Sequence, residues 1–475
     1  MPSGSTKNKH VPLIAELDTV LSPLEAFEHF KNRKFSFFLD SGMDPDKLGR
    51  YSFIGSNPFL VLSTRGDTGH LTQGTAKARM TGNPFDILRR LLEFYRLDPM
   101  PAPVPFTGGA VGYLSYDLCH FIEQLPQRAA DDLKVPECYF GFYDVVVAFD
   151  NKEHKAYIVS TGFPETNENK RRARAAKRIH DIKDRLTGPP LQHKSIPVSA
   201  LARSVLKSNF SHEGYVATVA KARQYIIDGE IIQVNLSQRF EADISIPPWE
   251  LYRRLRQINP APFAGYLGFE GVSIVSASPE RFIRRSGDFV ETRPIKGTRP
   301  RGKTEAEDHA LAAELLASAK DRAENVMIVD LERNDLGRVC RVGSVAVTEL
   351  AALETFPTVF HLTSTVTGRL REDADAIDIL KATFPGGSIT GAPKIRAMEI
   401  IDELEPTRRS VYTGGIGYLG FNGDLDLSIA IRTFIVKEGR AYFQVGGGVV
   451  YDSDPEAEYQ ETLHKGRALM DALSM

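Results

Sequence analysis

Lys296 is the residue of this chain whose surroundings most suggest chemistry. It stands between Pro294 and Gly297 in a short run, residues 294–299. Proline fixes one backbone angle and glycine permits unusual ones, so the lysine is expected to be held in a defined place. A positioned amine whose pKa is lowered can act as a nucleophile. The same run overlaps a second pattern, and the two patterns indicate different enzymes.

The second pattern is that of a phosphate-binding loop, GxxxxGK[ST], which residues 297–304 match in full. A helical pattern follows it, and then an apolar run, residues 326–329, that ends in Asp330 as a magnesium-binding strand would. A P-loop nucleotide-binding enzyme is therefore one hypothesis. Such a loop should follow a buried parallel strand, but residues 291–296 carry three charges and a proline, which make a poor central strand.

Two pairs of acidic residues stand at helical spacing. Glu458 and Glu461 are three positions apart with Lys465 one turn further, and Asp321 and Glu324 form a second such pair. Two carboxylate pairs would suit a hard cation such as Mg²⁺. Spacing alone favours a salt-bridged surface helix for the first pair, and it does not bring the two pairs together.

Two glycine-rich segments could admit a ligand to the backbone. Residues 385–394 form a turn into a helix, where backbone N–H groups favour an anion such as a carboxylate. Residues 446–448 are three glycines, which would allow close approach. Arg432 and Lys465 could each meet a carboxylate, although structural ion pairs are the alternative for both.

The bulk composition excludes several classes of protein. The 475 residues carry a formal net charge of −2, so nothing draws the whole chain to nucleic acid or to a membrane, and no apolar run is long enough for a membrane span. A basic helical run at residues 167–186 is offset by nearby acids and is expected to be a solvated helix face. The three scattered cysteines favour a reducing, cytoplasmic location.

The pattern of elements predicts a mixed α/β protein in two parts. We place an N-terminal domain at residues 12–165, a helix and linker at 166–207, and a catalytic domain at 208–472. Helices are predicted from Ser211 to Gly229, from Pro248, over residues 305–323, from Pro393 to Leu404 and from Pro455. Strands are predicted over residues 326–329, 411–419, 427–436 and 441–445. Residues 108–114 and 414–419 echo each other as glycine-opened strands.

Taken as a set, these runs resemble the chorismate-utilising enzymes. The resemblance rests on residues 278–282, 294–299, 321–338, 385–405 and 458–461, and residues 48–55 are similar to the first domain of the amino-transferring members. It implies a fold like that of anthranilate synthase component I: a two-part β-sheet sandwich flanked by helices. The active site would lie in the cleft of the C-terminal, chorismate-binding part.

The resemblance also implies a role for each matching position. The magnesium ligands would be Glu324 and Glu461, with Asp321 and Glu458 one turn away. Glu280 would be the general acid that helps the C4 hydroxyl of chorismate leave, because hydroxide is a poor leaving group. The residues that would surround the substrate are Gly297, Thr298, His361, Tyr412, Arg432, Gly448 and Lys465.

Two positions separate the reactions within the family. Members that add water at C2 have a lysine base where this chain has Gln233, and anthranilate synthases have alanine where it has Lys296. The resemblance therefore implies an aminodeoxychorismate synthase component I, a transferase of 4-aminobenzoate and folate biosynthesis. Lys296 would form a covalent adduct at C2 before ammonia adds at C4. Anthranilate synthase component I is the alternative.

The resemblance also implies a protein partner and suggests a second small-molecule ligand. No cysteine lies in a nucleophile-turn context such as GxCxG, so a separate glutamine amidotransferase subunit is expected to supply ammonia. A tryptophan pocket is a hypothesis for Ser41, Arg50, Tyr51 and Ser52, although residues 38–41 depart from the related pattern.

Overall fold

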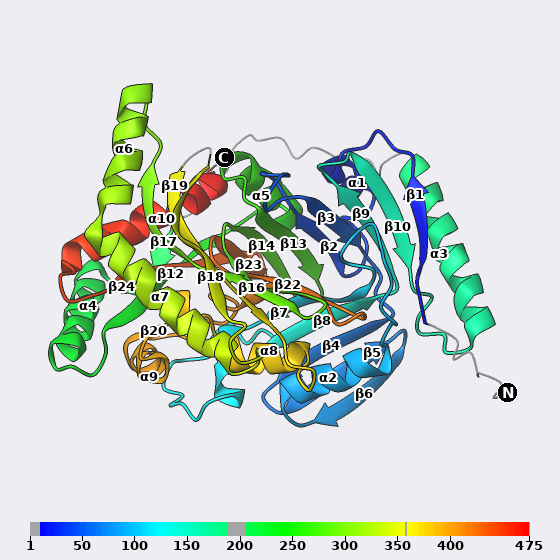
Figure 1. Ribbon diagram of the computed structural model, residues 1–475, viewed down its shortest axis with the longest axis horizontal. Coiled ribbons are helices and arrows are strands. Elements are labelled where there is room, and N and C mark those ends of the chain that lie inside the picture. Colours follow the sequence, from blue (N-terminus) through cyan, green and yellow to red (C-terminus); the bar gives the residue numbers. More distant parts are fainter. Residues whose placement is uncertain (1–9, 189–204, 357–358, 475) are drawn as a thin grey trace.

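Two large antiparallel sheets, stacked face to face with helices on their outer faces, form the protein (Figure 1). The computed structural model describes residues 10–188, 205–356 and 359–474. Within these ranges no helix combines the length and the apolar character needed to cross a lipid bilayer. The expected α/β sandwich flanked by helices is thus confirmed.

The first sheet combines strands from both ends of the chain. Its order is β1 (Leu13–Leu17), β10 (Lys155–Ser160), β9 (Val145–Asp150), β3 (Tyr51–Gly55), β2 (Ser36–Asp40), β13 (Phe263–Phe269), β14 (Val272–Ser278), β23 (Thr433–Lys437), β24 (Arg440–Val449), β12 (Gln233–Asp243) and β11 (Lys207–Ser208). The short β20 (Gly391–Ala392) also pairs with β12.

The second sheet is built in the same way. Its order is β17 (Ile295–Pro300), β19 (Val359–Arg369), β16 (Phe289–Arg293), β15 (Arg281–Ser286), β22 (Leu425–Ile429), β21 (Gly415–Gly420), β7 (Gly109–Leu114), β8 (Cys138–Tyr143), β4 (Leu60–Arg65), β5 (Thr68–Gln73) and β6 (Ala76–Thr81). β18 (Ala346–Thr355) pairs with the outer side of β19.

Each sheet therefore crosses the predicted domain boundary. The N-terminal and C-terminal strands meet at the β2–β13 pair in the first sheet and at the β7–β21 pair in the second. The echo between residues 108–114 and 414–419 falls on this second junction, where Gly112 lies opposite Gly417. The predicted linker falls largely on residues 189–204, outside the described residues.

Helices cover the two outer faces. They are α1 (Pro23–Glu28), α2 (Pro84–Phe94), α3 (Glu168–Thr187), α4 (His212–Ile227), α5 (Pro248–Ile258), α6 (Glu305–Ala317), α7 (Ala319–Gly337), α8 (Ala376–Thr383), α9 (Lys394–Leu404) and α10 (Pro455–Ser474), with single 3₁₀ turns η1 (Tyr116–Phe121) and η2 (Gly387–Ile389). The predicted helix starts hold: Ser211 caps α4, and Pro248 lies in the first turn of α5.

Three apolar layers hold this arrangement. Between the sheets, Phe53 of β3 meets Tyr418 of β21 edge-on, with ring centroids 5.6 Å apart. The outer face of the first sheet packs on α5 and α10, through Trp249 among others, and that of the second on α2, α7 and α8. Each fully buried large apolar side chain stabilises the fold by about 1.5–3 kcal/mol relative to an exposed one.

Two predicted strands are wrong. Residues 326–329 lie inside helix α7: Ile328 and Val329 are buried against the second sheet, whereas Val326 is 50% exposed, which is a helical and not an extended pattern. The predicted strand 427–436 is two strands, β22 and β23, which belong to different sheets. The chain crosses between them at Arg432, whose φ of 51° interrupts extended backbone.

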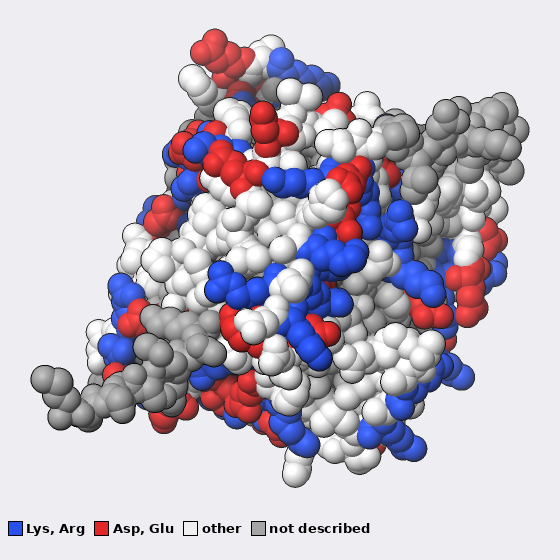
Figure 2. Space-filling model, turned by 90° about the vertical axis from the view of Figure 1, so that its right-hand side faces the viewer, with Lys and Arg blue, Asp and Glu red and all other residues white. Residues whose placement is uncertain are grey.

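The basic run at residues 167–186 is helix α3, as expected. Several of its cations have acidic partners: Arg174 and Arg178 both bond Asp144, and Lys177 pairs with Asp181. Figure 2 shows acidic side chains among the basic ones on the side of the molecule where α3 lies. The run is therefore a paired helix face.

Candidate active site

A cavity of about 830 Å³ lies where β17, β24, α7, α10 and the η2 turn come together. All thirteen residues predicted to act on the substrate or a metal line it: Glu280, Lys296, Gly297, Thr298, Asp321, Glu324, His361, Tyr412, Arg432, Gly448, Glu458, Glu461 and Lys465. Side chains separated by up to 185 positions in sequence thus share one space. The size suits a small organic substrate.

Lys296 and Glu280 meet through a single residue. The Lys296 amine donates a 2.8 Å hydrogen bond to the carbonyl oxygen of Ser388, and the Ser388 hydroxyl donates a 2.6 Å bond to Oε1 of Glu280. The backbone N–H of Ile295 donates a longer bond, 3.4 Å, to the same carboxylate oxygen. An amine and a carboxyl group are therefore held at one end of the cavity.

Burial tunes both groups in the direction that chemistry would need. It raises the pKa of Glu280 above its ordinary value, although the Ser388 bond and the Lys296 charge oppose it. It lowers the pKa of Lys296, against the attraction of Glu324 and Glu280. Glu280 is thus a better proton donor at neutral pH, and Lys296 a better nucleophile, than either is in water.

A break in strand register aims Lys296 into the cavity. Ile295 of β17 pairs with Thr363, and Thr298 with His361, so the register shifts across the two residues between. Gly297 lies at one of them, with φ of 87°. A Cβ at Gly297 would lie 3.1 Å from Leu315 and from Asp321, so glycine also allows the helices to approach. Such bulges commonly redirect a side chain beside an active site.

This geometry excludes a phosphate-binding loop. Residues 295–300 are a strand paired antiparallel with β19, not a loop after a parallel strand. Thr304 caps helix α6, and Arg301 pairs with Asp308 in the first turn of that helix. The strand expected to carry a magnesium-binding Asp330 is part of α7. The nucleotide-binding hypothesis is therefore wrong.

The far end of the cavity offers groups for a carboxylate. A 2.8 Å hydrogen bond joins Thr298 Oγ1 to Nδ1 of His361, and burial lowers the pKa of His361 to about 4, so the ring is neutral. Burial raises the pKa of Tyr412 to about 12, which leaves its hydroxyl able to donate. Arg432 donates to the carbonyl oxygen of Lys465, which ties β23 to α10.

Arg409 is a residue that the sequence reasoning missed. Its guanidinium, 2% exposed at the side chain, pairs with Glu405 and donates to the carbonyl oxygens of Ile389 and Asn235, at 2.9 and 2.8 Å. It also lies over the ring of Tyr412, 5.7 Å from the centroid. Arg409 thus joins three segments of the cavity wall, which fixes their relative positions.

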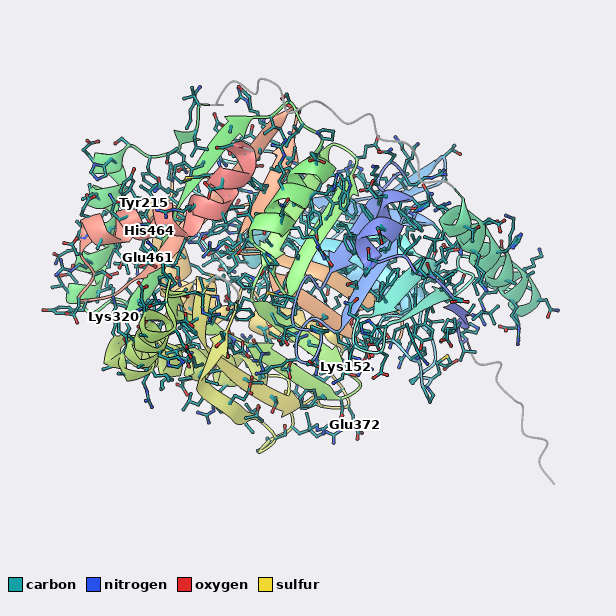
Figure 3. The ribbon with its side chains drawn as sticks, turned by 90° about the horizontal axis from the view of Figure 1, so that it is seen from above. Lys152, Tyr215, Lys320, Glu372, Glu461 and His464 are labelled. Carbon is teal, nitrogen blue, oxygen red and sulfur yellow. The ribbon has the colours of Figure 1, made fainter. Side chains whose placement is uncertain are left out.

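The predicted metal ligands come from two helices but are not gathered. Asp321 and Glu324 open α7, a helix separate from α6 and not its continuation, and Glu458 and Glu461 lie on α10. Figure 3 places Lys320 and Glu461 on the same side of the molecule, and both line the cavity. Among the described residues, no three His, Cys, Asp or Glu side chains are close enough together to hold a metal ion.

Three of the four acidic side chains already have partners within the protein. Asp321 pairs with Arg299, Glu461 pairs with Lys465 at 2.5 Å, and the Ser453 hydroxyl donates to Glu458. Glu324 has no hydrogen-bond or ion-pair partner in the described part of the chain. The donor chemistry still fits a hard cation, because four carboxyl groups line the same cavity. Gly447 helps to admit them: a Cβ there would lie 2.9 Å from a Glu458 oxygen.

The glycine-rich turn does bind a carboxyl group, but one from the protein. The backbone N–H of Gly387 donates a 3.1 Å hydrogen bond to Glu332 of α7. Burial raises the pKa of Glu332 to about 8. This contact anchors the η2 turn, and with it Ser388, on helix α7. Ser388 lies within a predicted functional run, but its two contacts span 92 and 108 positions and leave no local signal.

A second cavity, of about 420 Å³, contains most of the hypothetical tryptophan pocket. Ser41, Arg50 and Tyr51 line it. Ser52 does not: it is buried, and its hydroxyl accepts hydrogen bonds from the backbone of Ser41 and the side chain of Asn151. Ser52 therefore supports the residues that line this cavity and does not itself line it.

Comparison with known proteins places these features in a family. A profile of the family described as chorismate binding enzyme matches residues 45–471. The anthranilate synthase component 1 of Acetivibrio thermocellus is 42% identical over 97% of this chain and 93% of its own length. The aminodeoxychorismate synthase component 1 of Bacillus subtilis (strain 168) is 40% identical over 95% of this chain and 94% of its own.

A solved structure agrees in both sequence and shape. The crystal structure of anthranilate synthase component I from Streptococcus pneumoniae TIGR4 is 33% identical, with a TM-score of 0.79, over 98% of this chain and 100% of that one. The extent of these matches covers both sheets and the whole cavity. The chain belongs to the chorismate binding enzyme family.

Proposed function

We propose that the chain is the synthase component of an aminodeoxychorismate synthase. It converts chorismate and ammonia to 4-amino-4-deoxychorismate and water, a step toward 4-aminobenzoate and folate. The observation that carries the proposal is the Lys296 amine in the cavity, whose pKa is lowered. The amine lies 2.8 Å from the carbonyl oxygen of Ser388, and the hydroxyl of the same serine donates a hydrogen bond to Glu280.

The reaction divides one difficult substitution into two steps. The neutral amine of Lys296 attacks C2 of chorismate, both ring double bonds shift, and the C4–O bond breaks as Glu280 donates a proton, so that water leaves. The nitrogen bonded to C2 then gives up one proton, which restores the acid form of Glu280. Ammonia next forms a bond to C4, the double bonds shift back, and the C2–N bond to Lys296 breaks. The proton lost by ammonia returns to the lysine nitrogen, and Lys296 leaves as an amine.

The residues at the other end of the cavity orient the substrate. Tyr412, Arg432 and Lys465 meet one carboxylate, and Thr298 and His361 lie beside the ring. Mg²⁺ would be held by Glu324 and Glu461, with Asp321 and Glu458 beside them. When bound, the ion supplies positive charge that holds the second carboxylate.

A separate glutamine amidotransferase subunit supplies the ammonia in this proposal. Cys119, Cys138 and Cys340 are all buried, and burial raises the pKa of each thiol, so none is placed to serve as the nucleophile of a glutaminase. The names of the relatives describe each as component 1 of its enzyme. Such a name agrees with a second component that supplies ammonia.

The second candidate is anthranilate synthase component I. It is favoured by the names of the Acetivibrio relative and of the pneumococcal structure. Lys296 argues against it, because the resemblance gives anthranilate synthases alanine at that position.

Product identification separates the two candidates. The purified chain is incubated with chorismate, Mg²⁺ and ammonium, and the products are resolved by liquid chromatography with mass detection. 4-Amino-4-deoxychorismate as the main product supports the proposal, and anthranilate as the main product overturns it. Omitting ammonium is the control, since neither product can then form.

A further inference from the structure

The ion pair between Lys465 and Glu461 joins two residues with different predicted partners. Their Nζ and Oε1 atoms are 2.5 Å apart, one turn apart on α10, and their side chains are 36% and 46% exposed toward the cavity. The Lys465 amine also donates a 3.0 Å hydrogen bond to the carbonyl oxygen of Gly446. Two residues predicted to bind different ligands are thus bonded to each other.

The pair has a direct electrostatic consequence. Burial would raise the pKa of Glu461, but the charge and hydrogen bond of Lys465 outweigh it, and the pKa lies below the ordinary value. Glu461 is therefore ionised and held on the Lys465 side. Glu324, the other predicted ligand, lines the same cavity from α7 and has no hydrogen-bond or ion-pair partner among the described residues.

We propose that Lys465 is a resident counter-ion, which holds Glu461 until a divalent cation binds and is then released toward the substrate carboxylate. The inference rests on the metal and substrate sites of the proposed function. An ammonium group and a divalent cation both satisfy a carboxylate, but Mg²⁺ bound at about 2.0–2.1 Å from its oxygens repels the like charge of the amine and weakens the ion pair. The long, flexible stem of lysine lets the amine move while the backbone of α10 stays in place.

The exchange makes the two binding events cooperative. Without the cation, Lys465 opposes cation binding and is unavailable to the carboxylate; with the cation, it is free to bind the carboxylate. By linkage, the carboxylate must then strengthen cation binding by the same factor. The Gly446 carbonyl keeps one hydrogen bond to the amine near the cavity and limits how far it moves.

Mg²⁺ titration of the ligand-free chain tests the exchange. The variants are Lys465→Met and, as a matched control, Lys320→Met. Lys320 lies near enough to attract Glu324, Glu458 and Glu461 but is bonded to none of them in the described structure. A partly exposed ion pair changes an equilibrium by up to about fivefold. Lys465→Met is therefore expected to lower the Mg²⁺ dissociation constant by about fivefold, and Lys320→Met by less than about twofold.

The outcomes are distinct. If the Mg²⁺ dissociation constant falls equally in the two variants, Lys465 acts only through its positive charge and not as the partner of Glu461, and the proposal is overturned. Unchanged affinity in Lys465→Met, or the absence of Mg²⁺ binding in the wild type, also overturns it. Neither chorismate nor ammonia is present, so a failure of the proposed reaction, with anthranilate as product, leaves these results unaffected.

A measurement on the wild type covers the case in which Lys465→Met does not fold. Limited acetylation followed by peptide mass mapping reports the reactivity of each lysine amine. Mg²⁺ is expected to raise the labelling of Lys465 relative to that of Lys320, which serves as the internal reference for the general effect of a nearby cation. A ratio that Mg²⁺ leaves unchanged overturns the proposal.

Discussion

The hydroxyl of Ser388 donates a 2.6 Å hydrogen bond to Oε1 of Glu280, across 108 positions of the chain. The carbonyl of the same serine accepts the Lys296 amine. One residue of the η2 turn therefore sets the separation between the proposed acid and the proposed nucleophile. The turn is in its place because Glu332 and Arg409 bond the residues on either side, Gly387 and Ile389.

Ser388→Ala tests this relationship through the pH dependence. Activity requires Glu280 to hold its proton, so it falls as the pH rises through the pKa of Glu280. The Ser388 bond favours the carboxylate and lowers that pKa. Its loss is therefore expected to move the alkaline fall to higher pH, and kcat to drop roughly tenfold, the scale of a hydrogen bond to a charged group.

Ser388→Thr is the matched control, because it keeps the hydroxyl and should keep the wild-type pH profile. The titratable groups that interact with Glu280 are Lys296, Lys465 and Glu332, and the two variants change none of them. The measurement is the steady-state rate of chorismate consumption as a function of pH, from acid to alkaline conditions, for the wild type and both variants. A fall that moves to lower pH in Ser388→Ala contradicts the role given to this bond.

Lys296→Ala is expected to abolish the formation of 4-amino-4-deoxychorismate, because the covalent step has no other nucleophile. Lys303→Ala is the control: Lys303 is exposed and belongs to the apparent phosphate loop, and its removal should leave the rate unchanged. Wild-type protein incubated with chorismate in the absence of ammonia should gain the mass of chorismate less one water, on the peptide that contains Lys296. Unchanged turnover in Lys296→Ala removes the lysine from the mechanism.

The site was predictable where it depends on local spacing. Glu458, Glu461 and Lys465 share a face of α10, and the Pro–Gly surroundings of Lys296 do mark a defined backbone, a bulge in β17. The spacing left two interpretations of Glu461 open, a metal ligand or an ion-pair partner of Lys465, and the structure shows the ion pair. Ser388 and Arg409 act through contacts between distant segments, which no periodicity reveals.

The errors in the fold have physical causes as well. A four-residue apolar run fits a buried strand and one turn of a helix equally, and in residues 326–329 the flanking helical pattern of α7 decides. Residues 427–436 are mostly apolar because β22 and β23 are both buried, and the polar residues at the crossing, Arg432 and Thr433, did not by themselves mark a break between two strands. The predicted domain bounds left open whether the two parts share their sheets, and the structure shows that they do.

Tryptophan is expected to bind the second cavity. The space of about 420 Å³ is large enough for one small molecule, and its wall combines the aromatic rings of Tyr51 and Tyr418 with acidic and basic groups that could meet an amino acid. Equilibrium dialysis with labelled tryptophan should show saturable binding that unlabelled tryptophan displaces and unlabelled lysine does not. The absence of binding would dispose of the pocket hypothesis.

Gly448→Ala tests how closely β24 and β12 approach beside the substrate site. A Cβ at Gly448 would lie 2.2 Å from Nε2 of Gln233, whose side chain is fully buried and cannot turn outward. The substitution is expected to raise KM for chorismate by about tenfold, as overpacking of this size costs about 1–3 kcal/mol. The double variant Gly448→Ala with Gln233→Ala removes the clash and should recover most of the loss. Gly337→Ala, on α7 with open space around the added methyl group, should leave KM unchanged. A double variant no better than Gly448→Ala alone would show that the methyl group obstructs the substrate itself rather than Gln233.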